Sequence, residues 1–141
     1  MKKTASAKWK GGIKGGEGSI SSGSGVLKDA PYGFNARFED GPGTNPEELL
    51  GAAHAGCFSM ALSLQLGEAG MVPQSIETTA TVTLDKSDGG FSITAVHLDV
   101  RARIPGAEKQ AFEKAANAAK EGCPVSKVLN VKITMDAHLE A

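Results

Sequence analysis

Two long stretches of the chain alternate between apolar and polar residues. They are SIETTATVTLDK (residues 75–86) and FSITAVHLDVRARI (residues 91–104), with the turn-forming SDGG between them. Because successive side chains of a strand point to opposite faces, this alternation predicts two strands, and the short connection predicts an antiparallel hairpin. A weaker alternation over residues 5–10 and 18–22, separated by GGIKGGE, predicts a second hairpin near the N-terminus.

Residues 46–69 carry the signals of a long helix. Asn45 is a natural N-cap, proline suits the first helical position, and Glu47 and Glu48 favour the positive end of the helix dipole. Residues 49–67 have no formal charge and are small or apolar on nearly every face, so we expect this helix to be buried all round. A membrane span is the competing interpretation. We discount it because polar side chains interrupt a moderately hydrophobic run: His54, Ser59, Ser63 and Gln65.

The C-terminal part predicts two further helices and a final strand. Residues 107–121 have the periodicity of an amphipathic helix, which Gly122 closes. Cys123 and Pro124 then open a short helix, and residues 131–139 alternate as a closing strand.

The segment between the first hairpin and the long helix is rich in Gly, Pro, Asp and Asn. We expect a long loop that holds one short strand around residues 34–38. The predicted order is strands, long helix, strands, helix, strand. This order predicts a single α+β domain over residues 1–141, in which an antiparallel sheet wraps around a long buried central helix.

Composition narrows the class of partner. Fifteen basic and sixteen acidic residues give a net charge of −1. They are spread along the chain and leave no electrostatic footprint for nucleic acid or an anionic membrane, so a small neutral partner fits better. The first residues, MKKTASAKWKGGIKGG, lack the apolar region of a secretory signal, and we expect a cytoplasmic protein. A permanent disulfide is rare in a reducing compartment, so the two cysteines are expected to be either inert core residues or redox or catalytic groups.

The two cysteines have contrasting surroundings. Cys57 lies in the charge-free run AAHAGCFSMALSL, where burial alone raises the pKa of a thiol, so it is a packing residue unless a cation approaches. His54 lies one turn upstream on the same face, either as a base or as a hydrogen-bonded core residue. Cys123 precedes Pro124 at a helix start, where thiolates are stabilised, and local physics alone would nominate Cys123 as the reactive sulfur. A plain capping residue is the alternative.

Arginine is scarce in this chain. Arg101 and Arg103 share one face of a predicted strand, and we expect both to be solvated. Arg37 lies among aromatic residues in YGFNARFE, where a guanidinium and an apolar wall could face one cavity. An ion pair with Glu39 is the alternative interpretation of Arg37.

Three segments, PYGFNARFED, GTNPEELLGAAHAGCFSMALSL and EGCPVSKVL, together with the order of elements, resemble the osmotically inducible protein C (OsmC) family, relatives of the organic hydroperoxide resistance proteins. The resemblance covers essentially the whole chain. It implies an intertwined homodimeric thiol peroxidase that reduces organic hydroperoxides. It also implies that Cys57 is the peroxidatic cysteine, that Cys123 resolves it, and that Arg37 with Glu47 is the activating pair. We follow this assignment of the attacking sulfur because Arg37 supplies the cation that Cys57 lacks.

Electrostatics and helix geometry constrain this site. An arginine about 4 Å from a thiolate contributes on the order of 4 kcal/mol, or roughly three pKa units before desolvation is subtracted, which is enough to ionise Cys57. Glu47 would hold the guanidinium by bidentate hydrogen bonds. Ten helical residues rise about 15 Å, so we expect Arg37 and Glu47 of one subunit to serve Cys57 of the other, at two equivalent interface sites of a homodimer.

The expected reaction turns the Cys57 thiolate into a sulfenic acid, which Cys123 closes to a disulfide. The candidates for an apolar peroxide pocket are Phe34, Phe38, Phe58 and Met60. Recycling needs an external dithiol, for which the resemblance suggests dihydrolipoyl groups, and no bound cofactor or metal is expected. Two alternatives remain open: a non-catalytic, stress-induced dimer that binds a small apolar ligand, and a thiol-based acyl hydrolase that would not need Cys123.

Overall fold

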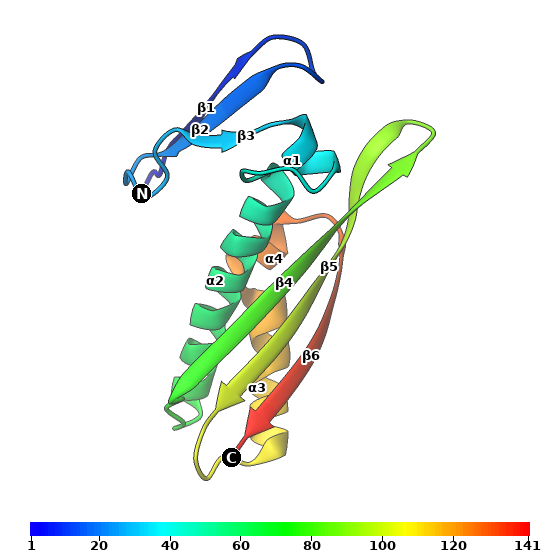
Figure 1. Ribbon diagram of the computed structural model, residues 1–141. Coiled ribbons are helices and arrows are strands. Elements are labelled where there is room, and N and C mark those ends of the chain that lie inside the picture. The colour runs from blue at the N-terminus through cyan, green and yellow to red at the C-terminus, as the bar shows by residue number, and fades with distance from the viewer. The chain divides into compact units, whose positions relative to one another are not determined.

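The computed structural model describes residues 1–141 and contains six strands and four helices (Figure 1). In chain order they are β1 (Ala5–Lys10), β2 (Glu17–Ser22), β3 (Ala30–Tyr32), α1 (Phe34–Phe38), α2 (Pro46–Glu68), β4 (Ser75–Ser87), β5 (Gly90–Arg103), α3 (Lys109–Gly122), α4 (Pro124–Val128) and β6 (Lys132–Glu140). The strands form two three-stranded sheets. The chain divides into two compact units, residues 1–49 and 50–141, and the boundary falls within α2.

The first unit contains an antiparallel sheet in the order β1-β2-β3. The β1–β2 register runs from the Ala5–Ser22 pair to the Lys10–Glu17 pair, which confirms the predicted N-terminal hairpin. The rings of Trp9 and Tyr32 lie 5.5 Å apart and pack across this sheet.

The short strand predicted at residues 34–38 is wrong, because these residues form helix α1. In FNARF, the apolar residues at alternate positions also place Phe34 and Phe38 one helical turn apart, and their ring centroids are separated by 5.0 Å. The N–H of Arg37 donates to the carbonyl of Gly33 at 3.1 Å, which closes the turn. Five residues are too few to distinguish a period of 2 from a period of 3.6, and the strand lies just upstream as β3.

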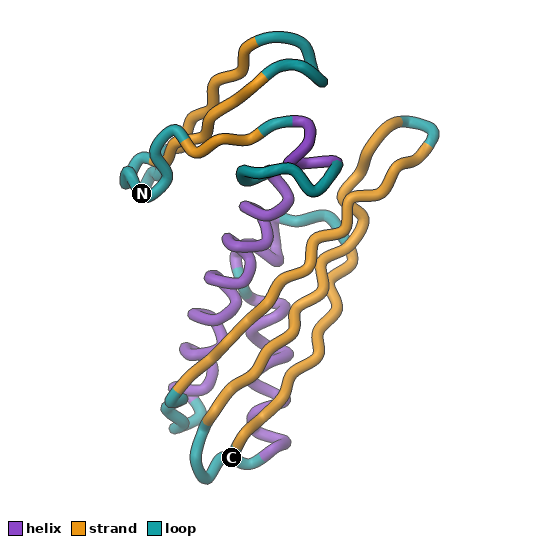
Figure 2. The backbone as a smooth tube through the Cα atoms, viewed as in Figure 1, coloured by secondary structure: helices purple, strands orange, loops and turns teal.

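The second unit contains the sheet β4-β5-β6. The predicted hairpin of β4 and β5 is confirmed, with a register that runs from Ser75–Arg103 to Ser87–Gly90. Strand β6, however, pairs parallel to β5, so the expected purely antiparallel sheet is wrong: this sheet is mixed, as the arrows of Figure 1 show. Figure 2 shows its three strands side by side. The reason for the parallel pairing is the long connection through α3 and α4, which returns the chain to the end of the sheet where β5 began.

Helices α2 and α3 pack on one face of the second sheet (Figure 1). Alternate side chains of β5 point into this core while Arg101 and Arg103 are exposed on the strand, as the alternation predicted. The α2 backbone approaches β4 closely at Gly51, where a Cβ atom would lie 3.3 Å from the Ala80 carbonyl oxygen. The core residues are Phe58, Leu62, Leu66, Val96, Leu98, Val100, Ala102, Ile104, Phe112, Ala115, Ala116, Ala119 and Cys123.

Burial of α2 is one-sided, contrary to the expectation that every face would be covered. Phe58, Leu62 and Leu66, spaced four residues apart, are fully buried, whereas Met60 is 77% and Leu64 62% exposed. One sheet covers only one side of a helix, so a uniformly apolar helix keeps an open face within a single chain. By length and composition alone α2 could cross a membrane, and in this structure one of its faces packs against the sheet.

Candidate active site

Both cysteines belong to the second unit and their sulfur atoms meet. Cys57 is half-buried on α2, and Cys123 is fully buried at the residue that ends α3 and caps α4. The two Sγ atoms lie 2.8 Å apart and are not bridged. Because the sulfur atoms of a disulfide are about 2.05 Å apart, a movement of less than about 1 Å would join them. The turn between the helices thus brings together two thiols that are 66 residues apart in the sequence.

The hydrogen bonds around this pair distinguish the two sulfurs. Burial raises the pKa of the Cys57 thiol, and hydrogen bonding with Cys123 raises it further. Burial acts in the same direction on Cys123, but hydrogen bonds from Cys57, from the N–H and hydroxyl of Ser126 and from the N–H of Val125 outweigh it and lower the pKa of Cys123. Within the second unit the anion is therefore favoured on Cys123, the sulfur that the helix-start argument nominates.

His54 is fully buried on α2, and its Nε2 lies 2.7 Å from the Ser126 hydroxyl oxygen. Burial lowers the pKa of this imidazole, which favours the neutral form. Its Nδ1 atom is buried without a hydrogen-bond partner. Of the two interpretations of His54, base or hydrogen-bonded core residue, this contact fits the second; its partner Ser126 was not predicted. The sequence did contain one indication: Ser126 follows the predicted helix start at Cys123 by three residues, so both side chains belong to the same first helical turn.

Arg37 and Glu47 belong to the first unit and form a bidentate ion pair. The guanidinium of Arg37, on α1, donates from Nε to Glu47 Oε1 at 2.9 Å and from Nη2 to Oε2 at 3.2 Å. The guanidinium also lies 5.2 Å from the ring centroid of Phe38. Glu47 lies in the first turn of α2 and is buried. The two hydrogen bonds show that the partner of Arg37 is Glu47 rather than Glu39.

Asn45 links the elements that carry this ion pair. Its Oδ1 accepts the N–H of Glu48 at 2.7 Å, which confirms the predicted N-cap of α2. Its Nδ2 donates to the Ala36 carbonyl at 2.9 Å, a tether between α1 and α2 that propensity alone does not predict. Arg37 and Glu47 therefore project from two elements that are joined by one asparagine.

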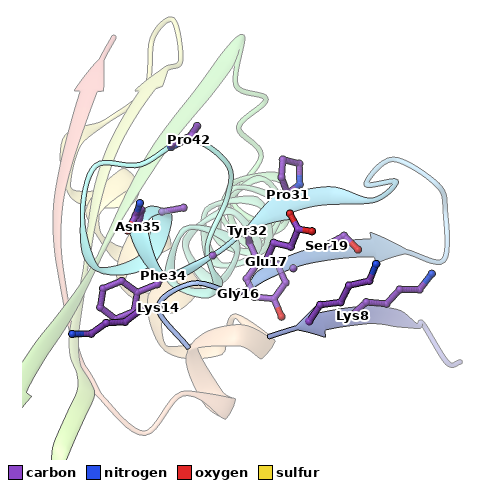
Figure 3. Close-up of a pocket in the computed structure, with 14 residues that line it drawn as sticks. Lys8, Lys14, Gly16, Glu17, Ser19, Pro31, Tyr32, Phe34, Asn35 and Pro42 are labelled. Carbon is purple, nitrogen blue, oxygen red and sulfur yellow. The ribbon is translucent and has the colours of Figure 1, made fainter. Parts of the chain in front are cut away.

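Two open pockets lie within the first unit. The smaller, about 240 Å³, is lined by the predicted Phe34, Phe38 and Arg37 together with Trp9 and Tyr32. The larger, about 550 Å³, lies beside it and is lined by the following residues (Figure 3): Lys8, Lys10, Lys14, Gly16, Glu17, Gly18, Ser19, Pro31, Tyr32, Gly33, Phe34, Asn35, Ala36 and Pro42. Arg37 thus faces an apolar pocket, the arrangement that the sequence suggested.

The two other predicted pocket residues lie in the second unit. Phe58 packs in the core with no exposed surface, and Met60 is on the open face of α2. The four catalytic candidates form two pairs, Cys57 with Cys123 and Arg37 with Glu47, one in each unit. No group of three or more His, Cys, Asp or Glu side chains within residues 1–141 is arranged to hold a metal ion.

Comparison with known proteins places this site in a family. The family described as OsmC-like protein matches residues 39–137, which include Glu47 and both cysteines. The chain belongs to the OsmC family. It is 56% identical over 139 residues to peroxiredoxin OsmC of Escherichia coli (strain K12), an alignment that covers 99% of this chain and 97% of the relative.

Two further members of the OsmC superfamily are similar in sequence or structure. The organic hydroperoxide resistance protein OhrB of Bacillus subtilis is 36% identical over 127 residues, covering 89% of this chain and 91% of its own. Its crystal structure gives a TM-score of 0.69 at 31% identity, with 97% of this chain and 98% of OhrB covered. An OsmC-like protein of unknown function from Vibrio cholerae gives a TM-score of 0.78 at 18% identity over 97% of this chain and 99% of that one. The fold is therefore the α+β OsmC-like fold, with a long central helix and two sheets.

Proposed function

We propose that this OsmC-family protein is a cysteine-based peroxidase that reduces organic hydroperoxides to alcohols. The observation that carries the proposal is the pair of free thiols, Cys57 and Cys123, whose sulfur atoms are 2.8 Å apart. Two thiols at this distance can store the two electrons that a hydroperoxide accepts. The 56% identity to a peroxiredoxin supports the same activity.

The cycle uses the two cysteines in sequence. The Cys57 thiolate attacks the distal oxygen of the hydroperoxide, the O–O bond breaks, and the alkoxide leaves as an alcohol after taking up a proton. Cys57 is now a sulfenic acid. Cys123 attacks its sulfur, the S–O bond breaks, and water leaves with the disulfide formed. An external dithiol reduces the disulfide and becomes a disulfide itself, which restores both thiols.

Attack by Cys57 needs a cation, because burial and the hydrogen bond with Cys123 both disfavour the Cys57 thiolate. Arg37 is the proposed source. Its guanidinium is held by Glu47 through two hydrogen bonds and faces an apolar pocket with Phe34 and Phe38, which suits an alkyl hydroperoxide. The same charge would stabilise the departing alkoxide. Met60, on the open face of α2, is proposed to complete the pocket, whereas Phe58 is fully buried in the core.

The protein is proposed to act as an intertwined homodimer in which Arg37 and Glu47 of one subunit serve Cys57 of the other. The open face of α2 supports this assembly, since Met60 and Leu64 expose apolar side chains on the helix that carries Cys57. A second copy of α2 would cover them. Residues 1–141 are proposed to act as a single domain, because α2 continues across the boundary between the units and the family match spans it.

The external reductant is proposed to be a dithiol of the dihydrolipoyl class. A cytoplasmic location is consistent with a cycle in which Cys57 and Cys123 must return to free thiols. The nature of the dithiol does not change the first half of the cycle, which depends only on the peroxide and the two cysteines.

A thiol count tests the proposal. Reduced protein is mixed with cumene hydroperoxide, and free thiols and cumyl alcohol are measured together. One equivalent of peroxide is expected to give one equivalent of alcohol and to consume both thiols, which a dithiol then restores. A protein that binds the peroxide without turnover would keep both thiols and release the hydroperoxide intact.

A further inference from the structure

A buried histidine and a buried serine lie directly behind the cysteine pair. His54 Nε2 is 2.7 Å from the Ser126 hydroxyl oxygen. Ser126 lies in the first turn of α4, which Cys123 caps, and its side chain favours the anion of Cys123, whose sulfur is 2.8 Å from that of Cys57. The path from the imidazole through Ser126 to Cys123 runs along buried residues, and Cys57 beyond it is half-buried. The catalytic cycle described above uses neither His54 nor Ser126.

The hydrogen-bonding capacity of these groups sets the direction of the path. A neutral imidazole has one N–H and one acceptor nitrogen, and a serine hydroxyl has one proton. If the imidazole proton were on Nδ1, a buried N–H would have no partner, since Nδ1 has none. On Nε2 the proton is donated to Ser126, and only a lone pair on Nδ1 is left unmatched. Ser126 then accepts from His54 and is free to donate its own proton to Cys123.

We propose that His54 is a positioning residue that donates through Nε2 to Ser126, so that the Ser126 hydroxyl stabilises the Cys123 thiolate that resolves the Cys57 sulfenic acid. The inference rests on the proposed peroxidase cycle. In the resolving step the Cys123–Cys57 S–S bond forms and the S–O bond of the sulfenic acid breaks. The proton that Cys123 gives up leaves with the hydroxide as water, so no further oxidant or reductant is needed.

The geometry favours a donor rather than a base. Burial lowers the pKa of His54, which makes the imidazole a poor proton acceptor. The same burial strengthens a hydrogen bond that it donates. Because the path ends on Cys123 rather than Cys57, its loss should slow disulfide formation and leave the first reaction with peroxide to Cys57 and its cation.

Single-turnover kinetics separate the two steps. Reduced protein is mixed with one equivalent of cumene hydroperoxide. Loss of peroxide reports oxidation of Cys57, while the disulfide and the dimedone-trapped sulfenic acid report resolution. Removing a hydrogen bond to a charged sulfur is expected to slow disulfide formation by about tenfold in Ser126→Ala and in His54→Leu. The midpoint of the pH profile for resolution should rise by about one unit.

Conservative variants distinguish the donor role from others. Ser126→Thr retains a hydroxyl, and His54→Gln places an amide N–H where Nε2 was, without any capacity to act as a base. Both are expected to resolve within about threefold of the unmodified protein. Thr134→Ala is the matched control, since Thr134 is the hydroxyl partner of an exposed histidine, His97, at 2.6 Å. It should change neither rate.

Three results would overturn the inference. They are folded Ser126→Ala and His54→Leu variants with the original rate and pH profile of resolution, a His54→Gln variant as slow as His54→Leu, or equal slowing in Thr134→Ala. If His54→Leu does not fold, His54→Gln is compared with His54→Asn, whose amide is too short to reach Ser126, and equal rates would refute the donor role. If the unmodified protein consumes no peroxide, the proposed function fails instead.

Discussion

The most quantitative test of how Cys57 is activated concerns the clamp, by which we mean the two hydrogen bonds from Arg37 to Glu47. Replacement of Glu47 by Gln preserves the shape of the side chain but removes its charge, and one of its two acceptors becomes a donor. The two bonds lost or weakened measure 2.9 and 3.2 Å. Charge-assisted hydrogen bonds contribute about 1.5–3 kcal/mol, and since the Arg37 side chain is 38% exposed, solvent screening reduces this to about 1–2 kcal/mol. At about 1.4 kcal/mol per factor of ten, we expect kcat/KM for cumene hydroperoxide to fall roughly tenfold.

Glu48→Gln is the matched control for this prediction. Glu48 is in the same first turn of α2, carries the same charge and accepts a hydrogen bond from Thr44 at 2.7 Å, but it does not bind the guanidinium. Its replacement should leave kcat/KM unchanged. In an Arg37→Lys background the bidentate geometry is already lost, so Glu47→Gln should then cost much less than it does alone. Equal effects of Glu47→Gln and Glu48→Gln, or full additivity with Arg37→Lys, would refute the clamp.

Three further predictions address resolution, assembly and pH. Cys123→Ser should complete one turnover and then lose activity as Cys57 is oxidised to sulfinic acid, which mass spectrometry detects. Sustained turnover of this variant with a dithiol as the only reductant would contradict a resolving role for Cys123. Met60→Asp combined with Leu64→Asp should shift the protein from dimer to monomer in sedimentation and abolish turnover, and a fully active monomer would contradict an interface site. The pKa of His54 is lowered from 6.5 in the folded chain, so the unfolded chain binds more protons below about pH 6.5. Folding stability should therefore fall as pH decreases through that region, and His54→Gln should flatten this dependence; an unchanged dependence in His54→Gln would contradict it.

Regular elements were predictable where the local pattern had only one solution. The alternation of β4 and β5 continues for more than ten residues each, and the capping residue Asn45 and the charges after it mark the start of α2. The short α1 was missed because five residues fit either period. The parallel pairing of β6 was missed because the direction of a strand depends on where the preceding helices return the chain, which the residues of β6 do not encode.

In the candidate site, too, some residues could be predicted from the local sequence, whereas their contacts could not. Cysteine chemistry and the helix start made Cys123 conspicuous, and the scarcity of arginine drew attention to Arg37. The meeting of Cys57 and Cys123 depends on tertiary packing, because α2 and the α3–α4 turn are separated by a hairpin and a helix. Ser126 was not predicted for a related reason. A serine in a short helix is ordinary until the fold buries it against a histidine from α2.

The one-sided burial of α2 has a physical explanation of the same kind. A helix without charged residues can be buried equally well by its own chain or by a second chain, so the sequence does not reveal which of the two covers it. In this chain the sheet covers the face with Phe58, Leu62 and Leu66, and the opposite face stays open. The apolar pattern thus predicts that α2 is buried, and the fold determines how much of its apolar surface remains for a partner to bury.

The measurement that bears most directly on the account is the identity of the first sulfur to react. The hydrogen bonds of the second unit favour the anion on Cys123, whereas the proposed cycle requires attack by Cys57. Cys123→Ser and Cys57→Ser are each mixed with one equivalent of cumene hydroperoxide and dimedone, and the labelled peptide is identified. We expect rapid labelling of Cys57 in Cys123→Ser and no rapid reaction in Cys57→Ser. Rapid peroxide loss with the label on Cys123 in Cys57→Ser would contradict the account.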